Sequence, residues 1–271
     1  MQFLKTVVTG ISLQLLLTVA LAKQTPAVPD TVAQFWKRIE RAKTVTYTVR
    51  SWRQDTFRTH GAVAGKTVFY VAGTYEIKVR RPNLLSIVRT PALQEYEITE
   101  EGKTHKAFEN YGDDIFTCDG KQSISRNSYF RSYTVGKAPK TLKEMKDDSG
   151  NNVPSGWLKE AMNWFYDDQP LDGYKQVSDA DFAATGQAVY LLESPSDPGR
   201  RQKIYFDSTT GQLTRISRLV KDSKDVWHET DRTEFRFWDF DVPLPAYIFD
   251  SRPPRNYRPW DEMVKEMKAK K

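Results

Sequence analysis

The stretch TVTYTVR, residues 44–50, decides the fold class of this 271-residue chain. Val45, Tyr47 and Val49 occupy every second position, and threonine or arginine stands between them. Because successive side chains of a strand point to opposite faces of its sheet, this alternation predicts a β-strand with one buried face and one polar face. The same period recurs in residues 75–80 and 95–99, which predicts further strands of the same kind.

Strands are predicted throughout the rest of the chain, whereas helices are few. In the last long strand, residues 226–240, we expect Phe235 and Phe237 on the face opposite Arg236 and Trp238. Apolar residues at three- and four-residue spacing predict a helix over residues 30–43. Ten or more strands without regular strand–helix alternation predict the α+β class, with one large antiparallel sheet and helices on one face. The other predicted strands are 66–71, 84–89, 114–118, 122–125, 130–135, 189–193, 203–206 and 213–219, and the other predicted helices are 141–146, 155–167 and 260–270.

The N-terminus has the order of features expected of a secretory signal peptide. A single charge at Lys5 precedes an apolar run over residues 7–21, and Ala20-Leu21-Ala22 is followed by a polar segment. The pattern predicts a signal peptide at residues 1–22 and a linker at residues 23–29. The alternative is a membrane anchor, but the apolar run is shorter than the ~20 residues that a spanning helix needs. No cysteine follows the small residues, so a lipid-attached N-terminus is not expected.

Cysteine content and charge narrow the function classes. Cys118 is the only cysteine, which excludes an intramolecular disulfide, and an exported chain without disulfides is typical of a bacterial cell envelope. The chain has 41 Lys and Arg against 35 Asp and Glu, a net charge of +6. Since no predicted helix carries a clustered basic stripe, we expect no nucleic-acid partner.

Several motifs follow one another in a defined order. The helix before residue 44 leads directly into the first strand, and a later strand ends in Arg81-Pro82-Asn83. Asp119-Gly120-Lys121 makes a turn after another strand, and Trp238-Asp239-Phe240-Asp241 precedes a proline-rich segment. This ordered set, over residues 30–254, resembles the outer-membrane lipoprotein carrier (LolA-like) superfamily and its less characterised lipoprotein-sorting-like relatives.

The resemblance implies a domain over residues 30–254 in which about eleven antiparallel strands form an incomplete β-barrel, with helices covering its concave face. It also implies an apolar cavity between sheet and helices, and periplasmic binding of acyl chains or lipidated proteins. The chain departs from the superfamily in its extra length at residues 145–169 and in its Pro/Arg-rich C-terminal segment. Residues 255–271 are expected to form a C-terminal helical tail. A shared fold does not decide the cargo.

Ligand contacts in such a cavity are expected from the apolar positions of the alternating strands. Arg50 and Arg80 are expected to be polar anchors at the cavity mouth. The alternative is that the apolar side chains form an ordinary core under the helices and that both arginines belong to a solvated strand face. The eight predicted cavity residues are Tyr47, Val49, Tyr75, Ile77, Val79, Ile87, Tyr96 and Ile98.

Catalytic and metal-binding signatures are lacking in the sequence. His60, His105 and His228 fall in unrelated segments without metal-ligand spacing. No nucleophile-elbow, phosphate-loop or dinucleotide-binding pattern occurs. We therefore expect no enzyme activity, no metal and no cofactor. A hydrolase stays open as an alternative, because catalytic groups can come together from distant parts of a chain.

The sequence therefore predicts a periplasmic protein of a Gram-negative-type bacterium, soluble and monomeric after signal cleavage, that holds a lipid, an acyl chain or a lipidated protein. The alternative is an envelope sensor or interaction module on the same fold, with a protein, a glycan or an envelope membrane protein as its partner. Tryptophan rings on one open surface would favour the module, and rings lining an enclosed cavity would favour the carrier. The tryptophans concerned are Trp52, Trp157, Trp164, Trp227, Trp238 and Trp260.

Overall fold

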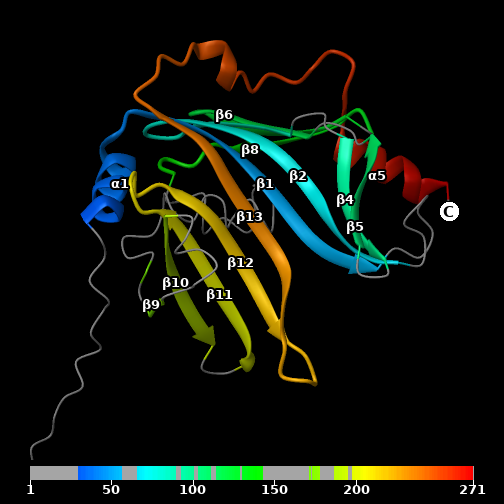
Figure 1. Cartoon of the computed structure of the whole chain (residues 1–271). Helices are drawn as coiled ribbons and strands as arrows, with labels where there is room; N and C mark the ends of the chain where they lie inside the picture. Colours follow the sequence, from blue (N-terminus) through cyan, green and yellow to red (C-terminus); the bar gives the residue numbers. More distant parts are fainter. Residues whose placement is uncertain are drawn as a thin grey trace, which may run out of the picture.

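The structure, a computed structural model, forms one curled sheet with two α-helices in the part of the chain that it describes (Figure 1). In that part, none of the helices is both long and apolar enough to cross a membrane. The predicted signal peptide and linker, and the helix predicted at residues 155–167, lie outside the described residues. The described residues are 30–56, 66–89, 93–100, 103–110, 114–128, 130–142, 171, 173–177, 186–194 and 197–270.

Fourteen strands form the sheet, in the order β14-β8-β7-β6-β3-β2-β1-β13-β12-β11-β10-β9, and β4 and β5 branch off from β2. All pairs are antiparallel except β14 with β8. Among the described residues, the two ends of the order are not paired with each other, so the sheet is open there, and the predicted α+β class is confirmed. The strand count exceeds the expected eleven by three, and the sheet includes the β4–β5 branch and two very short strands, β9 and β14, at its ends. The strands are β1 (Thr44–Thr56), β2 (Thr67–Arg80), β3 (Leu84–Arg89), β4 (Leu93–Glu100), β5 (Lys103–Asn110), β6 (Asp114–Asp119), β7 (Gln122–Asn127), β8 (Ser132–Lys137), β9 (Lys175–Val177), β10 (Gln187–Ser194), β11 (Asp197–Asp207), β12 (Leu213–Lys221), β13 (Trp227–Phe240) and β14 (Arg258–Pro259).

One face of this sheet is apolar across most of its width, and we call it the inner face. In the β1–β2 pair, Tyr47 lies opposite Ile77 and Val49 lies opposite Tyr75. Directly opposite residues share a face, so these side chains form one row, and each is at most 7% exposed. The buried inner face continues through Leu85, Ile87, Phe116, Cys118, Phe235, Ile216, Ile204 and Tyr190.

A bulge in β13 changes the face on which its aromatic residues lie. The β1–β13 register shifts between Thr46 and Thr48, and Phe237 takes a left-handed φ of 57° at that point. As a result Phe237 is 75% exposed, whereas Trp238 is 7% exposed and lies on the inner face with Phe235. The expectation that Phe235 and Phe237 share a face opposite Trp238 was therefore wrong, because one inserted residue reverses the alternation beyond it.

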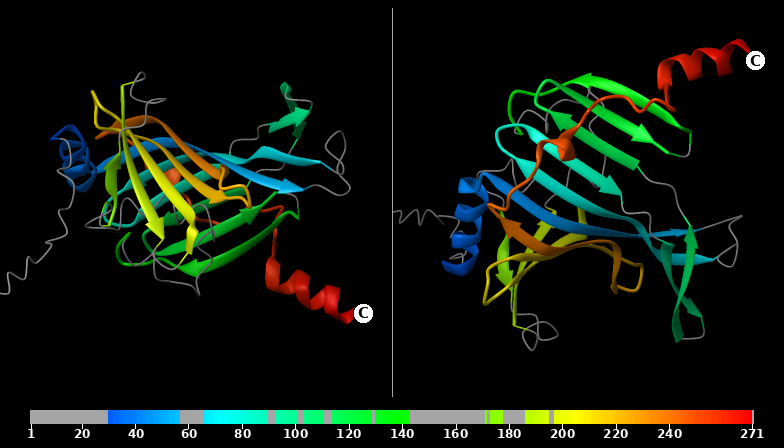
Figure 2. Two further views of the ribbon diagram at one scale, coloured as in Figure 1. Left: turned by 60° about the horizontal axis from the view of Figure 1, so that its bottom comes forward. Right: turned by 90° about the horizontal axis from the view of Figure 1, so that it is seen from above.

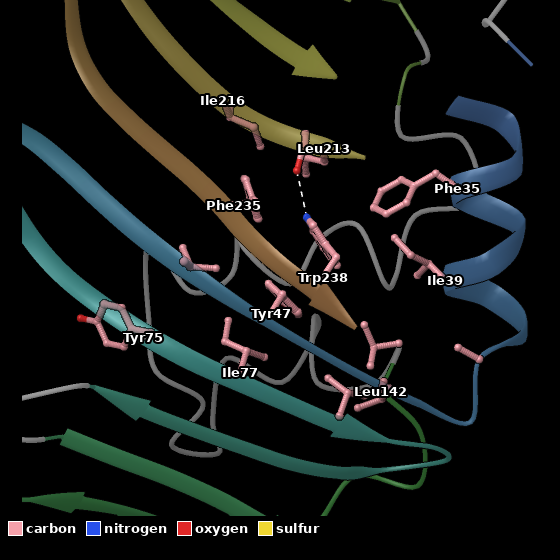
Figure 3. Packing of buried hydrophobic residues seen from close by; sticks show 14 of the residues in the cluster. Phe35, Ile39, Tyr47, Tyr75, Ile77, Leu142, Leu213, Ile216, Phe235 and Trp238 are labelled. Carbon is pink, nitrogen blue, oxygen red and sulfur yellow. Dashed lines mark hydrogen bonds between the residues drawn. The ribbon is translucent and has the colours of Figure 1, made fainter. Parts of the chain in front are cut away.

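Trp238 connects three elements at the centre of the core (Figure 3). Its ring stacks on Tyr47 of β1 at 4.3 Å and meets the edge of Phe35 at 5.1 Å. Its indole Nε1 donates a hydrogen bond to the carbonyl oxygen of Leu213 in β12, at 2.9 Å. Phe35 belongs to helix α1 (Asp30–Arg41), whose apolar stripe Val32, Phe35 and Ile39 is buried. The helix predicted at residues 30–43 therefore covers one end of the inner face.

The opposite, outer face of the sheet is crossed by a long C-terminal segment, residues 241–257, which we call the strap (Figure 2). The hydroxyl of Thr117 in β6 donates to the carbonyl oxygen of Asp250 at 3.0 Å. The hydroxyl of Ser251 donates to the Asp119 carboxylate at 2.5 Å, and Ser251 is fully buried. The strap includes one short helix, η2 (Ala246–Phe249), and leads to β14 and then to the last helix, α5 (Trp260–Ala269). Both faces of the sheet are thus covered in part.

Gly211, in the β11–β12 turn, is predicted to be required for the close packing of this turn against the start of α1. It has φ +68°, and a Cβ there would lie 2.0 Å from the backbone oxygen of Thr31. We expect Gly211→Ala to lower the free energy of unfolding by about 3 kcal/mol, measured by urea denaturation, because strain and a backbone clash add. Gly186→Ala is the control: φ there is +71°, but the nearest atom, Ser208 Oγ, is 3.6 Å away, so about 1 kcal/mol is expected. Equal losses in both variants would contradict the clash.

Candidate functional site

The structure brings together six of the eight predicted cavity residues. Tyr47, Val49, Tyr75, Ile77, Val79 and Ile87 belong to one buried cluster on the inner face. Ile98 is 2% exposed but lies in β4, which pairs with the far end of β2 beside Phe69 and Tyr70. Tyr96 is in the same strand, so these two positions are not part of the row. The six residues are the candidate surface for an apolar ligand.

Arg50 and Arg80, the predicted anchors, both lie on the outer face. Arg80 donates from Nη1 to the backbone oxygen of Leu244 in the strap at 3.0 Å. Arg50 lies opposite Glu234 in the β1–β13 register, and its Cζ is 4.9 Å from the Trp52 ring centroid. Neither side chain is brought together with the apolar row, since each neighbours a row residue and strands alternate their faces.

Arg89 is the arginine that the structure places at the end of the row. It lies opposite Tyr75 in the β2–β3 register, is 8% exposed, and has its Cζ 5.9 Å from the Tyr75 ring centroid. Leu85, Ile87 and Arg89 occupy alternate positions of one strand, so the period that predicted Ile87 could also have indicated Arg89. The inner face thus has a positive charge beside its apolar row.

Tyr190 of β10 is a second residue that sequence reasoning missed. It is fully buried on the inner face, opposite Ile204 of β11, and meets Phe206 edge-to-face at 5.6 Å. Burial raises the pKa of its hydroxyl to about 12, so the group stays a protonated donor at neutral pH. Within the described residues its hydroxyl has no hydrogen-bond partner. A buried hydroxyl without a partner costs about 1–3 kcal/mol, and no sequence pattern indicates such a cost.

Charged side chains gather on the outer face of β12 and β13, and they are paired with one another. Glu229 accepts hydrogen bonds from Arg232, at 2.5 Å, and from Arg215. Glu234 is 2.8 Å from Arg236. Burial acts to raise the pKa of the Glu229 carboxyl, but hydrogen bonds from Arg232 and the charge of Arg215 outweigh it and lower the pKa below its ordinary value. The cluster has the features of a structural ion network.

Metal-ligand clusters and the single cysteine are the catalytic features that the described part of the chain allows us to check. There, no three His, Cys, Asp or Glu side chains are placed so that they could hold a metal ion. Cys118 is fully buried in β6, and burial raises the pKa of its thiol, which disfavours the reactive thiolate. Two open hollows, of 280 Å³ beside Trp260 and of 530 Å³ beside Arg80, lie away from the apolar row.

Comparison with known proteins finds similarity in structure alone. No family model and no curated protein matches the chain. An uncharacterized conserved protein from Thermus thermophilus is 12% identical, with a TM-score of 0.33, over 84% of this chain and 97% of that one. A domain described as outer membrane lipoprotein-sorting, from Vibrio parahaemolyticus, is 10% identical, with a TM-score of 0.33, over 81% and 94% of the two chains.

A LolA superfamily protein from Nitrosomonas europaea is 9% identical, with a TM-score of 0.31, over 82% of this chain and 96% of that one. The printed description of that protein names the superfamily that the motifs of this chain resemble. Because these TM-scores are low, no ligand or partner is inferred from them, and the function is argued from the chain's own residues.

The ion network around Glu229 is predicted to make stability depend on pH. Its pKa is lower in the folded chain than in the unfolded one, so its contribution is complete above the unfolded value near pH 4.3 and is lost as the pH falls through the folded value. We expect Glu229→Gln to lower the free energy of unfolding by about 2 kcal/mol at pH 7, with the difference from the unmodified chain shrinking towards pH 3. Urea denaturation at several pH values measures this. A difference independent of pH would contradict it.

Proposed function

We propose that the chain binds the apolar part of an amphiphile, namely a lipid, an acyl chain or a lipidated protein, against its inner face, after export to the periplasm. The observation that carries this proposal is the apolar inner face itself. It spans β6, β3, β2, β1, β13, β12, β11 and β10, and its side chains share one buried cluster. The proposal includes no catalytic step.

An acyl chain gains free energy on such a surface by leaving water. Each buried methylene contributes about 0.8 kcal/mol, so some fifteen methylenes contribute on the order of 12 kcal/mol. The row residues Tyr47, Ile77 and Val79 are at most 1% exposed, so a ligand must take the place of side chains that now cover them. The net free energy of binding is the difference between the ligand's contacts with the row and the contacts of the side chains that it displaces. A small difference suits a carrier, because a carrier must also release its load.

The polar end of the ligand is proposed to meet Tyr190 or Arg89. The Tyr190 hydroxyl is a protonated donor without a partner in the described part of the chain, and a carbonyl or hydroxyl oxygen of the ligand would supply one. Arg89 adds a positive charge beside the row, which favours an anionic or strongly accepting group. Both are inner-face residues, and each replaces part of the role expected of Arg50 and Arg80.

The described tryptophans do not offer the open aromatic surface that the interaction module would need. Trp238 is buried on the inner face, and Trp52 is 2% exposed beneath arginines of the outer face. Trp227 and Trp260 lie in different elements, the first at the start of β13 and the second in α5. Among the described residues there is therefore no open surface that several tryptophan rings share. Trp157 and Trp164 lie outside the described residues.

Native mass spectrometry of the mature protein, purified from its own cell envelope and followed by lipid extraction, tests the proposal. We expect a co-purified lipid or acylated peptide near one per chain, because a single inner face offers one apolar surface. A control sample is delipidated and incubated with a long-chain phospholipid, which should restore the bound mass. An unchanged ligand-free mass in both samples would make the inner face an ordinary core.

Tyr190→Phe is predicted to separate ligand binding from folding. The variant removes only a hydroxyl, so affinity for a fluorescent acyl ligand with a carbonyl end should fall about fivefold, the worth of one hydrogen bond. Stability without ligand should stay equal or rise by about 1 kcal/mol, since an unpaired buried group is lost. Tyr205→Phe, which changes a buried tyrosine on the outer face of the neighbouring strand, is the matched control and should leave affinity unchanged. Equal affinities in both variants would remove Tyr190 from the site.

A further inference from the structure

Helix α5 projects beyond the sheet at the C-terminal end of the chain (Figure 2). It packs on β14 and β8 at its start, and none of its ten residues is buried. Asp261 and Glu262 stabilise its first turn, because negative charge is favourable at the positive end of the helix dipole. The helix therefore presents most of its surface outside the core.

Helix α5 has an apolar stripe that is exposed at Trp260 and Met267 and half-buried at Met263 and Val264. Trp260, Met263, Val264 and Met267 have the spacing i, i+3, i+4, i+7, which places them on one face of a helix. Trp260 is 37% exposed and Met267 is 50% exposed. Phe130, 49% exposed before β8, extends the stripe, since its ring centroid is 5.5 Å from that of Trp260. These five residues form one apolar ridge, a name we keep below.

Lysine side chains lie beside the apolar stripe of the ridge. At 100° per residue, Lys268 and Lys270 flank the stripe on its two sides, with Asp261 on the same side as Lys268, whereas Lys265, Glu262 and Glu266 lie on the opposite half of the helix. The segment 251–271 carries seven Lys and Arg against three Asp and Glu, a charge of +4. Helix α5 itself holds two Lys against three acids, so the excess comes from the residues on either side of it, where Arg252 and Arg258 are paired with Asp250 and Glu266. An apolar face flanked by lysines is typical of a helix that lies in the surface of a bilayer.

We propose that the apolar ridge docks the protein onto an anionic lipid surface. The stripe would sit at the boundary of head groups and acyl chains, and the stems of Lys268 and Lys270 would run along it with their ammonium groups at the lipid phosphates. A second copy of the chain is a less suitable occupant, because it would bring a second +4 segment against the first. The docking surface stands on α5, the basic residues of the segment 251–271 and Phe130, so it holds whether or not the inner face carries a ligand.

Flotation of the full mature chain with vesicles tests the docking surface. Vesicles of phosphatidylcholine with about one-third phosphatidylglycerol are compared with pure phosphatidylcholine. We expect at least about tenfold stronger binding to the anionic vesicles, weakened by about 0.5 M salt because screening shortens the reach of the lysines. Met267→Glu should lower binding at least about tenfold while the circular dichroism spectrum stays unchanged, since the residue is 50% exposed and makes few packing contacts.

A matched pair of charge reversals locates the contact. Lys268→Glu, beside the stripe, should lower vesicle binding about fivefold, whereas Lys265→Glu, on the opposite half of the helix, should change it less than about twofold. Equal losses in the two variants would show non-specific attraction and overturn the docking surface. Absence of binding to anionic vesicles would do the same. Sedimentation showing a dimer that Met267→Glu dissolves would assign the ridge to a second copy and also overturn the proposal.

Discussion

The bulge that turns Trp238 onto the inner face is the feature on which the rest of the architecture depends. β13 is the strand between β1 and β12, and Trp238 contacts both: its ring stacks on Tyr47, and its Nε1 donates to Leu213. The same ring supports Phe35 of α1. Without the inserted residue Phe237, strand alternation would point Trp238 outward, and the two halves of the sheet would lose their shared aromatic contact.

The two faces of the sheet are covered by different kinds of interaction. The inner face is covered by apolar packing. Such packing is non-directional, so one apolar neighbour can be replaced by another. The outer face binds the strap through directed hydrogen bonds, such as those from Thr117 and Arg126 to the backbone of Asp250. The strap lacks strands that would satisfy its carbonyl groups, so side chains of the sheet satisfy them. The inner face, which is covered by non-directional apolar packing, thus lies on the opposite side of the sheet from the outer face, which binds the strap through directed hydrogen bonds.

Two polar groups, the Arg89 guanidinium and the Tyr190 hydroxyl, lie at different places on the apolar inner face. Arg89 marks one end of the apolar row, and the Tyr190 hydroxyl lies among apolar side chains of the other half of the sheet. A purely structural core has no need of either group, because each costs free energy to bury. The apolar ridge of α5, for which we propose a lipid contact, lies outside that face, next to β14, the strand at the end of the sheet that pairs with β8. The two proposed roles, binding an amphiphile and docking on a lipid surface, would then belong to separate surfaces of one chain.

Alternation in the sequence determined the strands, the α+β class and the six residues that share the buried row of the inner face, because side chains at every second position of a strand lie on one face. Alternation could not determine the face of Trp238, since the bulge at Phe237 inserts one residue and the apolar and polar pattern of residues 226–240 does not show it. Alternation also could not predict that Ile98 lies apart from the row, since the pattern of one strand does not indicate which other strand it pairs with. Only the tertiary structure decided that Arg50 and Arg80 face the strap side and that Tyr190 lacks a partner among the described residues, because partners come together from distant parts of the chain.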